Sequence, residues 1–212
     1  MPLFYQQDIN ATTKLAIWQI EEQELFFLAK VPLQSNITHP HKRLQHLAGR
    51  YLLPFLFPDF PNKEILIATT RKPFLPDEQY HFSISHCGNF AAAIVSKNER
   101  VGIDIEIETP KVAKIAHKFL NDEEKDAVNR QPPTVNRILT LFWCAKETIF
   151  KWWGNGEVDF KEHIQLFYIT IAKKNVLKSS FTKLLPAQDL DVHYQFFNDL
   201  CLTFTHTIYV KQ

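Results

Sequence analysis

Three carboxylates occupy alternate positions near the middle of the 212-residue chain. They are Asp104, Glu106 and Glu108, in the stretch VGIDIEIETP that spans residues 101–110. In a strand these side chains project to one side, about 6.6 Å apart, while the valine and isoleucine side chains project to the other. A half-buried strand with a solvated acidic face is one explanation, although like charges on one face repel. A hard cation is the other, because Mg²⁺ typically binds one or two carboxylates together with substrate phosphate.

A second group of charged residues lies on a predicted helix. In FWCAKETIFKWWG, residues 142–154, Glu147 and Lys151 stand one helical turn apart, with Cys144 a turn earlier on the same side. An ordinary helical Glu–Lys pair, worth about 0.2–0.5 kcal/mol, explains this spacing without any function. Alternatively, Glu147 is a further oxygen ligand for a cation held by the acidic strand.

Basic residues and histidines gather in the first half of the chain. The stretch FSISH, residues 82–86, ends at His86, which is either a structural histidine bonded to backbone or a catalytic one. The stretch HPHKRLQHLAGRYLLPFLF, residues 39–57, predicts an amphipathic helix with a locally basic polar side. The residues on that side are His41, Lys42, Arg43, His46 and Arg50. A solvated basic face is the simplest explanation of this pattern.

Periodicity and turn residues predict the elements that must position these side chains. In the first half we expect strands over 14–20, 81–86, 90–96 and 101–108, and helices over 21–31 and 39–57. The last three strands are separated only by short turns, which predicts a three-stranded meander.

In the second half, Thr109 is expected to cap a helix whose first position is Pro110. Asn121 and Glu124 then have the spacing of a capping box, and a longer helix begins at about residue 135 and ends at Gly154. Further strands are expected over 164–172, 192–197 and 200–210. Helices and antiparallel hairpins therefore recur in both halves.

Composition limits the classes of protein that remain. A hydrophobic fraction of 45% with 18 Phe argues against disorder. The 24 Lys and Arg nearly balance the 23 Asp and Glu, so the overall charge gives no reason to expect nonspecific binding to nucleic acid or membrane. The three cysteines have no CxxC pairing, and the N-terminal stretch has no signal-peptide pattern. We expect a soluble cytoplasmic protein.

In their order and separation, three segments resemble the signature of the Sfp type of 4′-phosphopantetheinyl transferases. These segments are FSISH (82–86), GIDIE (102–106) and WCAKETIFK (143–151), with weaker support from GRYLL and RKP. The resemblance covers over half of the chain. It implies an α+β pseudo-dimer of two similar halves, 1–103 and 104–212, each with a small antiparallel sheet and packed helices. The active site of such a protein lies in the cleft between the halves.

Members of this family transfer the phosphopantetheine arm of coenzyme A to a serine of an acyl, peptidyl or aryl carrier protein, with Mg²⁺, and release 3′,5′-ADP. The resemblance therefore implies a monomeric transferase whose partners are coenzyme A and an apo carrier protein. The carrier protein itself, whether from fatty-acid, polyketide or nonribosomal peptide synthesis, is not specified by the sequence.

The resemblance assigns the acidic and catalytic residues one by one. Asp104, Glu106 and Glu147 match the Mg²⁺-binding acids, and Lys151 matches the lysine near the reacting phosphate. Glu147, or a water that it orients, is the expected proton acceptor. Because a metal-bound carboxylate is a weak base, direct abstraction, a water relay and a role for Glu106 stay open.

The residues that bind coenzyme A are assigned in the same way. Ser85 and His86 match contacts to the coenzyme A phosphates, and Lys72 matches a position near the nucleotide. Arg43 and Arg50 are the candidates for the 3′-phosphate, and the sequence does not choose between them.

Two positions depart from the family pattern. Cys144 stands where the family generally has Ser or Thr, and a thiol is the weaker hydrogen-bond donor. Cys144 is not a candidate nucleophile. Glu108 matches no family position and is assigned to the surface.

Two other classes of protein fit the sequence. A noncatalytic module that binds a carrier protein or coenzyme A would keep the fold, although the presence of all three acids and Lys151 argues against it. Another Mg²⁺-dependent enzyme that cleaves phosphodiesters would hydrolyse its substrate with water.

Overall fold

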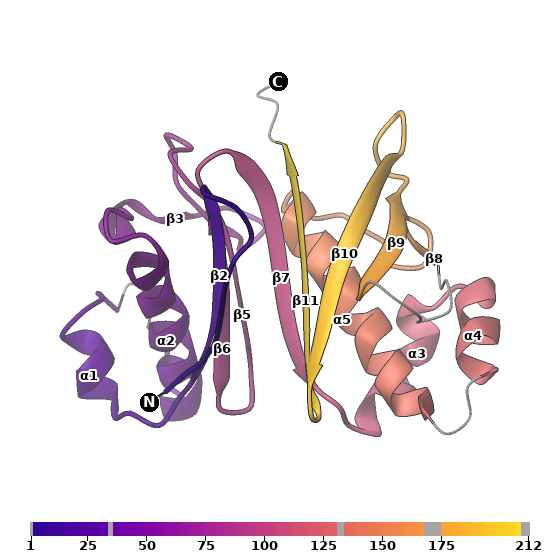
Figure 1. The fold of residues 1–212 in the computed structure, drawn as a ribbon, viewed down its shortest axis with the longest axis horizontal. Helices are drawn as coiled ribbons and strands as arrows, with labels where there is room; N and C mark the ends of the chain where they lie inside the picture. Colours follow the sequence, from indigo (N-terminus) through magenta and orange to yellow (C-terminus); the bar gives the residue numbers. More distant parts are fainter. Residues whose placement is uncertain (1, 34–35, 131–133, 168–174, 209–212) are drawn as a thin grey trace. The chain divides into compact units, whose positions relative to one another are not determined.

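The computed structural model describes residues 2–33, 36–130, 134–167 and 175–208, and the chain forms two compact units (Figure 1). The first unit comprises Met1–Ile103 with Thr207–Gln212, and the second comprises Asp104–His206. Each unit combines an antiparallel sheet with packed helices and has its own hydrophobic core. The predicted α+β class is confirmed.

The first unit is built on a four-stranded antiparallel sheet of order β1-β2-β6-β5. The strands are β1 (Leu3–Asp8), β2 (Thr13–Gln19), β5 (His81–Cys87) and β6 (Phe90–Ser96). Helix α2 (Pro40–Leu56) packs against β2, β5 and β6, and the short helix α1 (Glu24–Leu28) packs against α2. A 3₁₀ helix (Asn62–Glu64) and the paired strands β3 (Leu66–Ile67) and β4 (Pro73–Phe74) lie between α2 and β5 in the sequence.

Helix α2 comes unusually close to β5 at one glycine. A Cβ atom built on Gly49 would lie 2.6 Å from Cγ2 of Ile84, so no other residue fits there without a shift. Leu47, Leu52 and Leu53 of α2 are fully buried in the core of this unit. The glycine therefore allows the helix that carries the basic residues to lie directly on strand β5.

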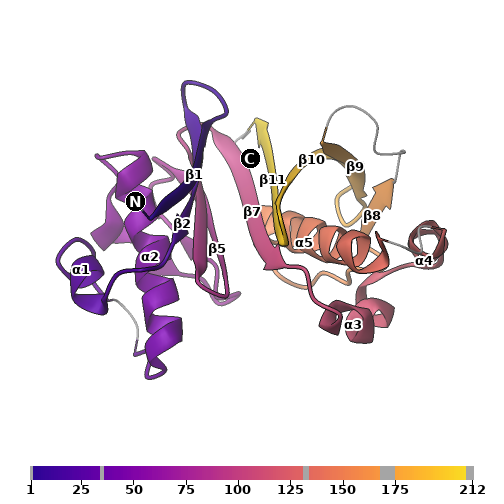
Figure 2. The same cartoon turned by 60° about the horizontal axis from the view of Figure 1, so that its bottom comes forward.

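The second unit is built on the sheet of order β7-β11-β10-β9-β8, and the boundary between the units falls within β7, after Ile103, and near the end of β11, after His206. The strands are β7 (Glu99–Ile107), β8 (Ile164–Phe167), β9 (Val176–Phe181), β10 (Gln188–Phe197) and β11 (Leu200–Ile208). Helix α5 (Val135–Trp153) contacts β8 and β10, and α3 (Lys111–Phe119) and α4 (Asp122–Asn129) both contact α5 (Figure 2). The helix α5 is thus enclosed by the sheet and by two shorter helices.

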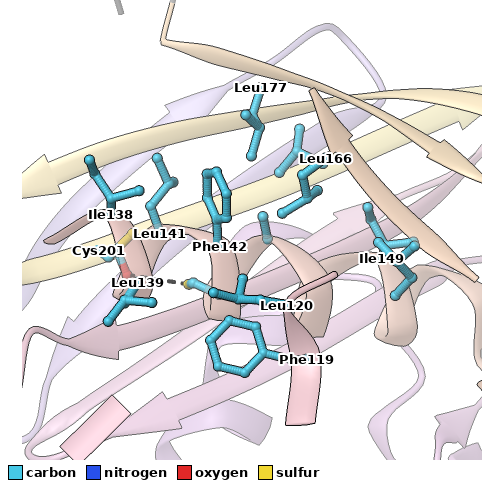
Figure 3. Packing of buried hydrophobic residues seen from close by; sticks show 14 of the residues in the cluster. Phe119, Leu120, Ile138, Leu139, Leu141, Phe142, Ile149, Leu166, Leu177 and Cys201 are labelled. Carbon is cyan, nitrogen blue, oxygen red and sulfur yellow. Dashed lines mark hydrogen bonds between the residues drawn. The ribbon is translucent and has the colours of Figure 1, made fainter. Parts of the chain in front are cut away.

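The apolar stripe of α5 forms the core of this unit. Ile138, Phe142 and Ile149 are buried at helical spacing and pack with Leu166 and Leu177 from the sheet (Figure 3). The helix ends at Gly154, whose φ of 73° is the left-handed conformation that favours glycine, as predicted. The core fixes one side of α5, while Glu147 and Lys151 are not among the buried residues of this helix.

The predicted meander is wrong in its third strand. Strand β6 lies between β2 and β5, so both of its edges are occupied, and β7 pairs with β11 instead. Alternation of apolar residues identifies a strand but does not identify the strand that pairs with it. The acidic strand therefore belongs to the sheet of α5 and not to that of α2.

Other boundaries differ by smaller amounts. The helix expected over 21–31 is reduced to α1, and the strands β1, β3, β4 and β9 were not predicted. The strand expected over 164–172 is β8, and its remainder lies outside the described residues. Pro110 precedes α3 instead of opening it, while Oγ1 of Thr109 accepts a bond from the backbone N of Lys111. None of the helices described is both long and apolar enough to cross a bilayer.

Candidate active site

Strand β7 carries two acidic side chains that have little exposure to solvent. Asp104 is only 3% exposed, and Glu106 is half-buried. Every residue from Val101 to Ile105 is buried, so both faces of this part of the strand are covered. The solvated acidic face that the alternation allowed is therefore excluded at Asp104.

Helix α5 brings the predicted catalytic pair to these acids. The Lys151 ammonium donates a hydrogen bond to Oδ1 of Asp104, with Nζ and Oδ1 2.5 Å apart. Glu147 lies one turn before Lys151 and interacts electrostatically with both Asp104 and Glu106. The structure thus assembles Asp104, Glu106, Glu147 and Lys151, which the sequence had singled out.

Burial and mutual repulsion perturb the acids of this cluster. Desolvation, and then the negative charge of Asp104, raise the pKa of Glu106 to about 7. The same two causes raise the pKa of Glu147 to about 7. Burial alone would lower the pKa of Lys151, but Asp104 and Glu147 outweigh it and the pKa is raised. Perturbation of several neighbouring groups is typical of a functional site.

The acids have the chemistry of a site for a hard cation. Carboxylate oxygens are the ligands that Mg²⁺ prefers, and their mutual repulsion would be relieved by a bound divalent ion. In the part of the chain that the structure describes, no three His, Cys, Asp or Glu side chains are gathered closely enough to hold a metal ion as they stand. The Lys151 ammonium instead neutralises part of the negative charge at Asp104.

The basic residues of α2 lie in two different environments. Arg50 is 4% exposed, and its Nη1 makes no hydrogen bond to the residues described. Burial lowers the pKa of Arg50 to about 10. His46, one turn earlier, has its pKa lowered to about 4 by burial and by the charges of Arg50 and His86. A solvated basic face is therefore the wrong explanation for Arg50.

The guanidinium of Arg43 already donates hydrogen bonds to two residues. Its Nη2 donates to Oε2 of Glu24 at 2.7 Å, and its Nη1 donates to the carbonyl of Ile37 at 3.4 Å. Both side chains of this ion pair are about 70% buried. The pair links α1 to α2, so Arg43 has a structural role that Arg50 lacks.

The other predicted coenzyme A contacts also lie in the first unit. Ser85 is buried on β5, and the neighbouring His86 is exposed. Lys72 precedes β4, and its pKa is lowered to about 8 by burial and by the charge of Arg100. The structure therefore places His86 within electrostatic reach of His46, and Lys72 within reach of Arg100 and His81.

Comparison with known proteins decides the family. Residues 100–205 match the model of the 4′-phosphopantetheinyl transferase superfamily. This chain belongs to that superfamily. The matched segment contains both acids of β7 and all of α5, so the resemblance seen in the sequence is confirmed.

Curated relatives in this superfamily resemble the chain over part of its length. Enterobactin synthase component D of Escherichia coli (strain K12) is 31% identical over 135 residues, 61% of this chain and 63% of that protein. The 4′-phosphopantetheinyl transferase AcpT of the same strain is 32% identical over 130 residues, 58% of this chain and 65% of that protein. The chain thus spans less than two thirds of the length of the relatives it matches.

The position where this superfamily member departs from the motif is buried. Cys144 is fully buried, accepts a hydrogen bond from Oγ1 of Thr203 at 3.3 Å, and lies 3.8 Å from the carbonyl oxygen of Cys201. Thr203 in turn bonds Thr148 on α5 at 2.6 Å. Burial raises the pKa of the Cys144 thiol. Cys144 therefore joins α5 to β11, and its burial and raised pKa disfavour the thiolate that a nucleophile needs.

The sequence interpretation gave no site role to two side chains that lie beside predicted site residues, Trp143 in the second unit and His46 in the first. The indole nitrogen of Trp143 donates to Oε1 of Glu106 at 3.2 Å, and Trp143 lies one turn before Glu147. His46 lies one turn before Arg50 on α2. Both have the i, i+4 spacing that places side chains on one helix face, so this spacing could have revealed them. Glu108, assigned to the surface, is half-buried and forms an ion pair with Arg137 at 3.5 Å.

Proposed function

We propose that this protein transfers the phosphopantetheine arm of coenzyme A to a serine of an apo carrier protein and releases 3′,5′-ADP. The observation that carries this proposal is the cluster of Asp104, Glu106, Glu147 and Lys151 on β7 and α5, within the segment that matches the superfamily; Asp104 is buried and the other three are half-buried. The name of the AcpT relative, a 4′-phosphopantetheinyl transferase, supports transfer of the same group.

We assign Asp104, Glu106 and Glu147 as the ligands of Mg²⁺. Their carboxylate oxygens, and the raised pKa values of Glu106 and Glu147 beside Asp104, fit a divalent cation, which when bound would supply charge neutralisation at the pyrophosphate. The bond from Trp143 holds the Glu106 carboxylate in a fixed orientation. Lys151, already bonded to Asp104, stabilises the charge that develops on the phosphate oxygens.

The proton of the attacking serine needs an acceptor. We assign this role to Glu147, directly or through one water, as the family pattern implies and because it lies on α5 one turn before Lys151, next to the acids of β7. Glu106 has the same perturbed pKa but its Oε1 already accepts a bond from Trp143. Glu147 is therefore the better candidate of the two.

The phosphates of coenzyme A are assigned to the first unit. Ser85, His86 and Lys72 bind the pyrophosphate and the nucleotide, as the family pattern implies. For the 3′-phosphate we favour Arg50 over Arg43, because Arg50 is buried with Nη1 unbonded while Arg43 is held by Glu24. A guanidinium of this kind can form charge-assisted, bidentate bonds to a phosphate. The two halves, 1–103 and 104–212, would then divide substrate binding from metal binding and catalysis.

Incubation of the protein with coenzyme A, Mg²⁺ and a panel of apo carrier proteins tests the proposal. We expect a mass gain of one phosphopantetheine on at least one carrier, located to its serine by fragmentation. Release of free phosphopantetheine instead would indicate a hydrolytic enzyme. No product, with binding of the carrier or of coenzyme A, would indicate a noncatalytic module.

We also propose that the protein acts in the cytoplasm and as a monomer. All three cysteines, Cys87, Cys144 and Cys201, are free thiols, which fits a reducing compartment. Light scattering of the purified protein tests the monomer, and fractionation of the source cells tests the location.

A further inference from the structure

A fully buried lysine stands on α5 directly before the proposed base. Lys146 has 0% of its surface exposed, and its Nζ forms an ion pair with Oε2 of Glu124 at 2.7 Å. The same nitrogen lies 2.8 Å from three carbonyl oxygens, those of Phe119, Phe160 and Ile164. An ammonium has three N–H donors, so these four acceptors use all of its capacity.

The acceptors come from separate parts of the second unit. The carbonyl of Phe119 is at the end of α3, where the helix leaves its last carbonyls without a partner of their own. Phe160 and Ile164 lie in the connection from α5 to β8 and at the start of that strand. One side chain therefore joins α5 to α3, to α4 through Glu124, and to the segment that enters the sheet.

The carboxylate of Glu124 also accepts hydrogen bonds at both of its oxygens. Oε2 of Glu124 also accepts from the backbone N of Asn121 at 3.0 Å, as part of the capping box that begins α4. Oε1 of Glu124 accepts from the backbone N of Leu166, also at 3.0 Å. The carboxylate is 1% exposed. The pair thus forms a closed network that involves no residue of the proposed active site.

This network constrains how α5 is rotated about its axis. Consecutive helical residues project about 100° apart, so Lys146 points toward α3 and α4 while Glu147 points to another side. A helix anchored by one buried, multiply bonded side chain cannot turn without breaking those bonds. The direction of Glu147, and of Lys151 one turn later, is thereby fixed.

We propose that Lys146 and Glu124 are positioning residues: their buried network holds α5 in the rotation that points Glu147 and Lys151 at Asp104 and Glu106. This inference rests on the proposed transferase function. A reaction that depends on the position of its groups is sensitive to small displacements, since a shift of about 1 Å can reduce the rate by about 10²-fold.

The alternative is that the network only stabilises the fold. Buried ion pairs are weak evidence for that role, because apolar residues of similar volume often replace them at no loss of stability. The replacement Lys146→Met with Glu124→Met removes both charges together and separates the two roles. Glu124→Gln is a milder second variant, because it leaves Lys146 and its three carbonyl bonds in place.

The experiment measures three properties of the folded variants. Rates are divided by the fraction of folded protein, determined by circular dichroism, so that loss of stability does not count as loss of activity. We expect kcat per folded molecule to fall by about 10²-fold in the double variant, with KM for coenzyme A within about twofold. The affinity for Mn²⁺ in the presence of coenzyme A, followed by electron paramagnetic resonance, should fall several-fold.

Lys178→Met is the matched control. It removes an exposed lysine of the same unit, whose ion pair with Asp191 joins β9 to β10 at the surface. This variant should keep the kcat and the Mn²⁺ affinity of the wild type. Wild-type kcat and Mn²⁺ affinity per folded molecule in both network variants would overturn the positioning role. If the wild-type protein modified no carrier, the proposed function would fail, and the Mn²⁺ affinities would still test the positioning role.

Discussion

The two units of this protein carry charge clusters of opposite sign in similar surroundings. In the first unit, burial and neighbouring cations lower the pKa of His46, and burial lowers that of Arg50. In the second, burial and a neighbouring anion raise the pKa values of Glu106 and Glu147. Each cluster holds ionisable groups partly or fully away from water, where a charge costs free energy unless an opposite charge binds. A metal-bound pyrophosphate ester offers both signs of charge.

The clusters differ in how much opposite charge they already contain. The acids hold Lys151 among them, bonded to Asp104 at 2.5 Å. Arg50 has no ion pair to a carboxylate within the residues described. We therefore expect anion binding to affect Arg50 strongly, whereas the acidic cluster is partly neutralised before any cation binds.

Among these variants, replacement of Asp104 should reduce the rate of transfer the most. Asp104 raises the pKa of both glutamates and bonds Lys151, so Asp104→Ala should abolish transfer while the protein stays folded. Mg²⁺ with coenzyme A should raise the melting temperature of the wild type and not of the variant. Equal thermal shifts in the two proteins would contradict the assignment of the metal ligands.

Glu147→Gln and Lys151→Ala should divide the roles of two residues on one helix. The glutamine keeps the shape but loses charge and basicity, so kcat should collapse and the Mg²⁺ dependence should shift to higher concentration. Lys151→Ala should lower kcat by about 10²–10³-fold with a nearly unchanged Mg²⁺ midpoint. Titrations of the rate with Mg²⁺ measure both effects. A midpoint that moves as far in Lys151→Ala as in Glu147→Gln would refute this division.

Replacement of Arg50 should reduce activity less. Its effect on KM should depend on which substrate is used. Arg50→Leu should raise KM for coenzyme A far more than KM for 3′-dephospho-coenzyme A, because only the former has the 3′-phosphate. Without ligand it should also raise the melting temperature, since burial disfavours the charge that it removes. Arg43→Leu is the matched control on the same helix, and it should leave the ratio of the two KM values unchanged. A selective loss with Arg43→Leu alone would reverse the assignment.

The smallest effects are expected in the pH dependence of stability. Stability should fall toward high pH because of Glu147 in the second unit, and toward low pH because of His46 in the first. Glu147 has a folded pKa of about 7 against an ordinary 4.5, so its contribution to stability is present below pH 4.5 and is lost as pH rises through 7. His46 has a folded pKa of about 4 against 6.5, so its contribution is present above pH 6.5 and is lost as pH falls through 4.

Melting curves measured without metal between pH 4 and pH 8 test the predicted pH dependence of stability for both groups. Glu147→Gln should reduce the loss of stability toward high pH, and His46→Gln should reduce the loss toward low pH. Parallel curves for the variants and the wild type would show that neither group titrates as described.

The sequence predicted the residues of each cluster better than the sheets that carry them. Asp104, Glu147 and Lys151 were identified by their spacing, because alternation in a strand and i, i+4 steps in a helix are local properties. The pairing of β7 with β11 was not predicted. These strands are about a hundred residues apart, and the alternation of apolar residues along a strand does not identify the strand that pairs with it.

Burial was the other property that the sequence did not reveal. Arg50 has the same residue type and helix as Arg43, yet one is buried with Nη1 unbonded and the other is paired with Glu24. Lys146 was not singled out in the sequence, although it is fully buried. These differences depend on α1, α3 and α4, whose packing follows from contacts distant in the sequence.

The central claim is that the acidic and basic clusters serve one group transfer, and product stoichiometry tests it most directly. The protein would be incubated with coenzyme A, Mg²⁺ and an apo carrier that it modifies, beside the same carrier with its serine replaced by alanine. We predict that 3′,5′-ADP and modified carrier appear in equal amounts, and that neither forms with the alanine carrier. Release of 3′,5′-ADP at the same rate with both carriers would contradict the account, because water and not the serine would then be the acceptor.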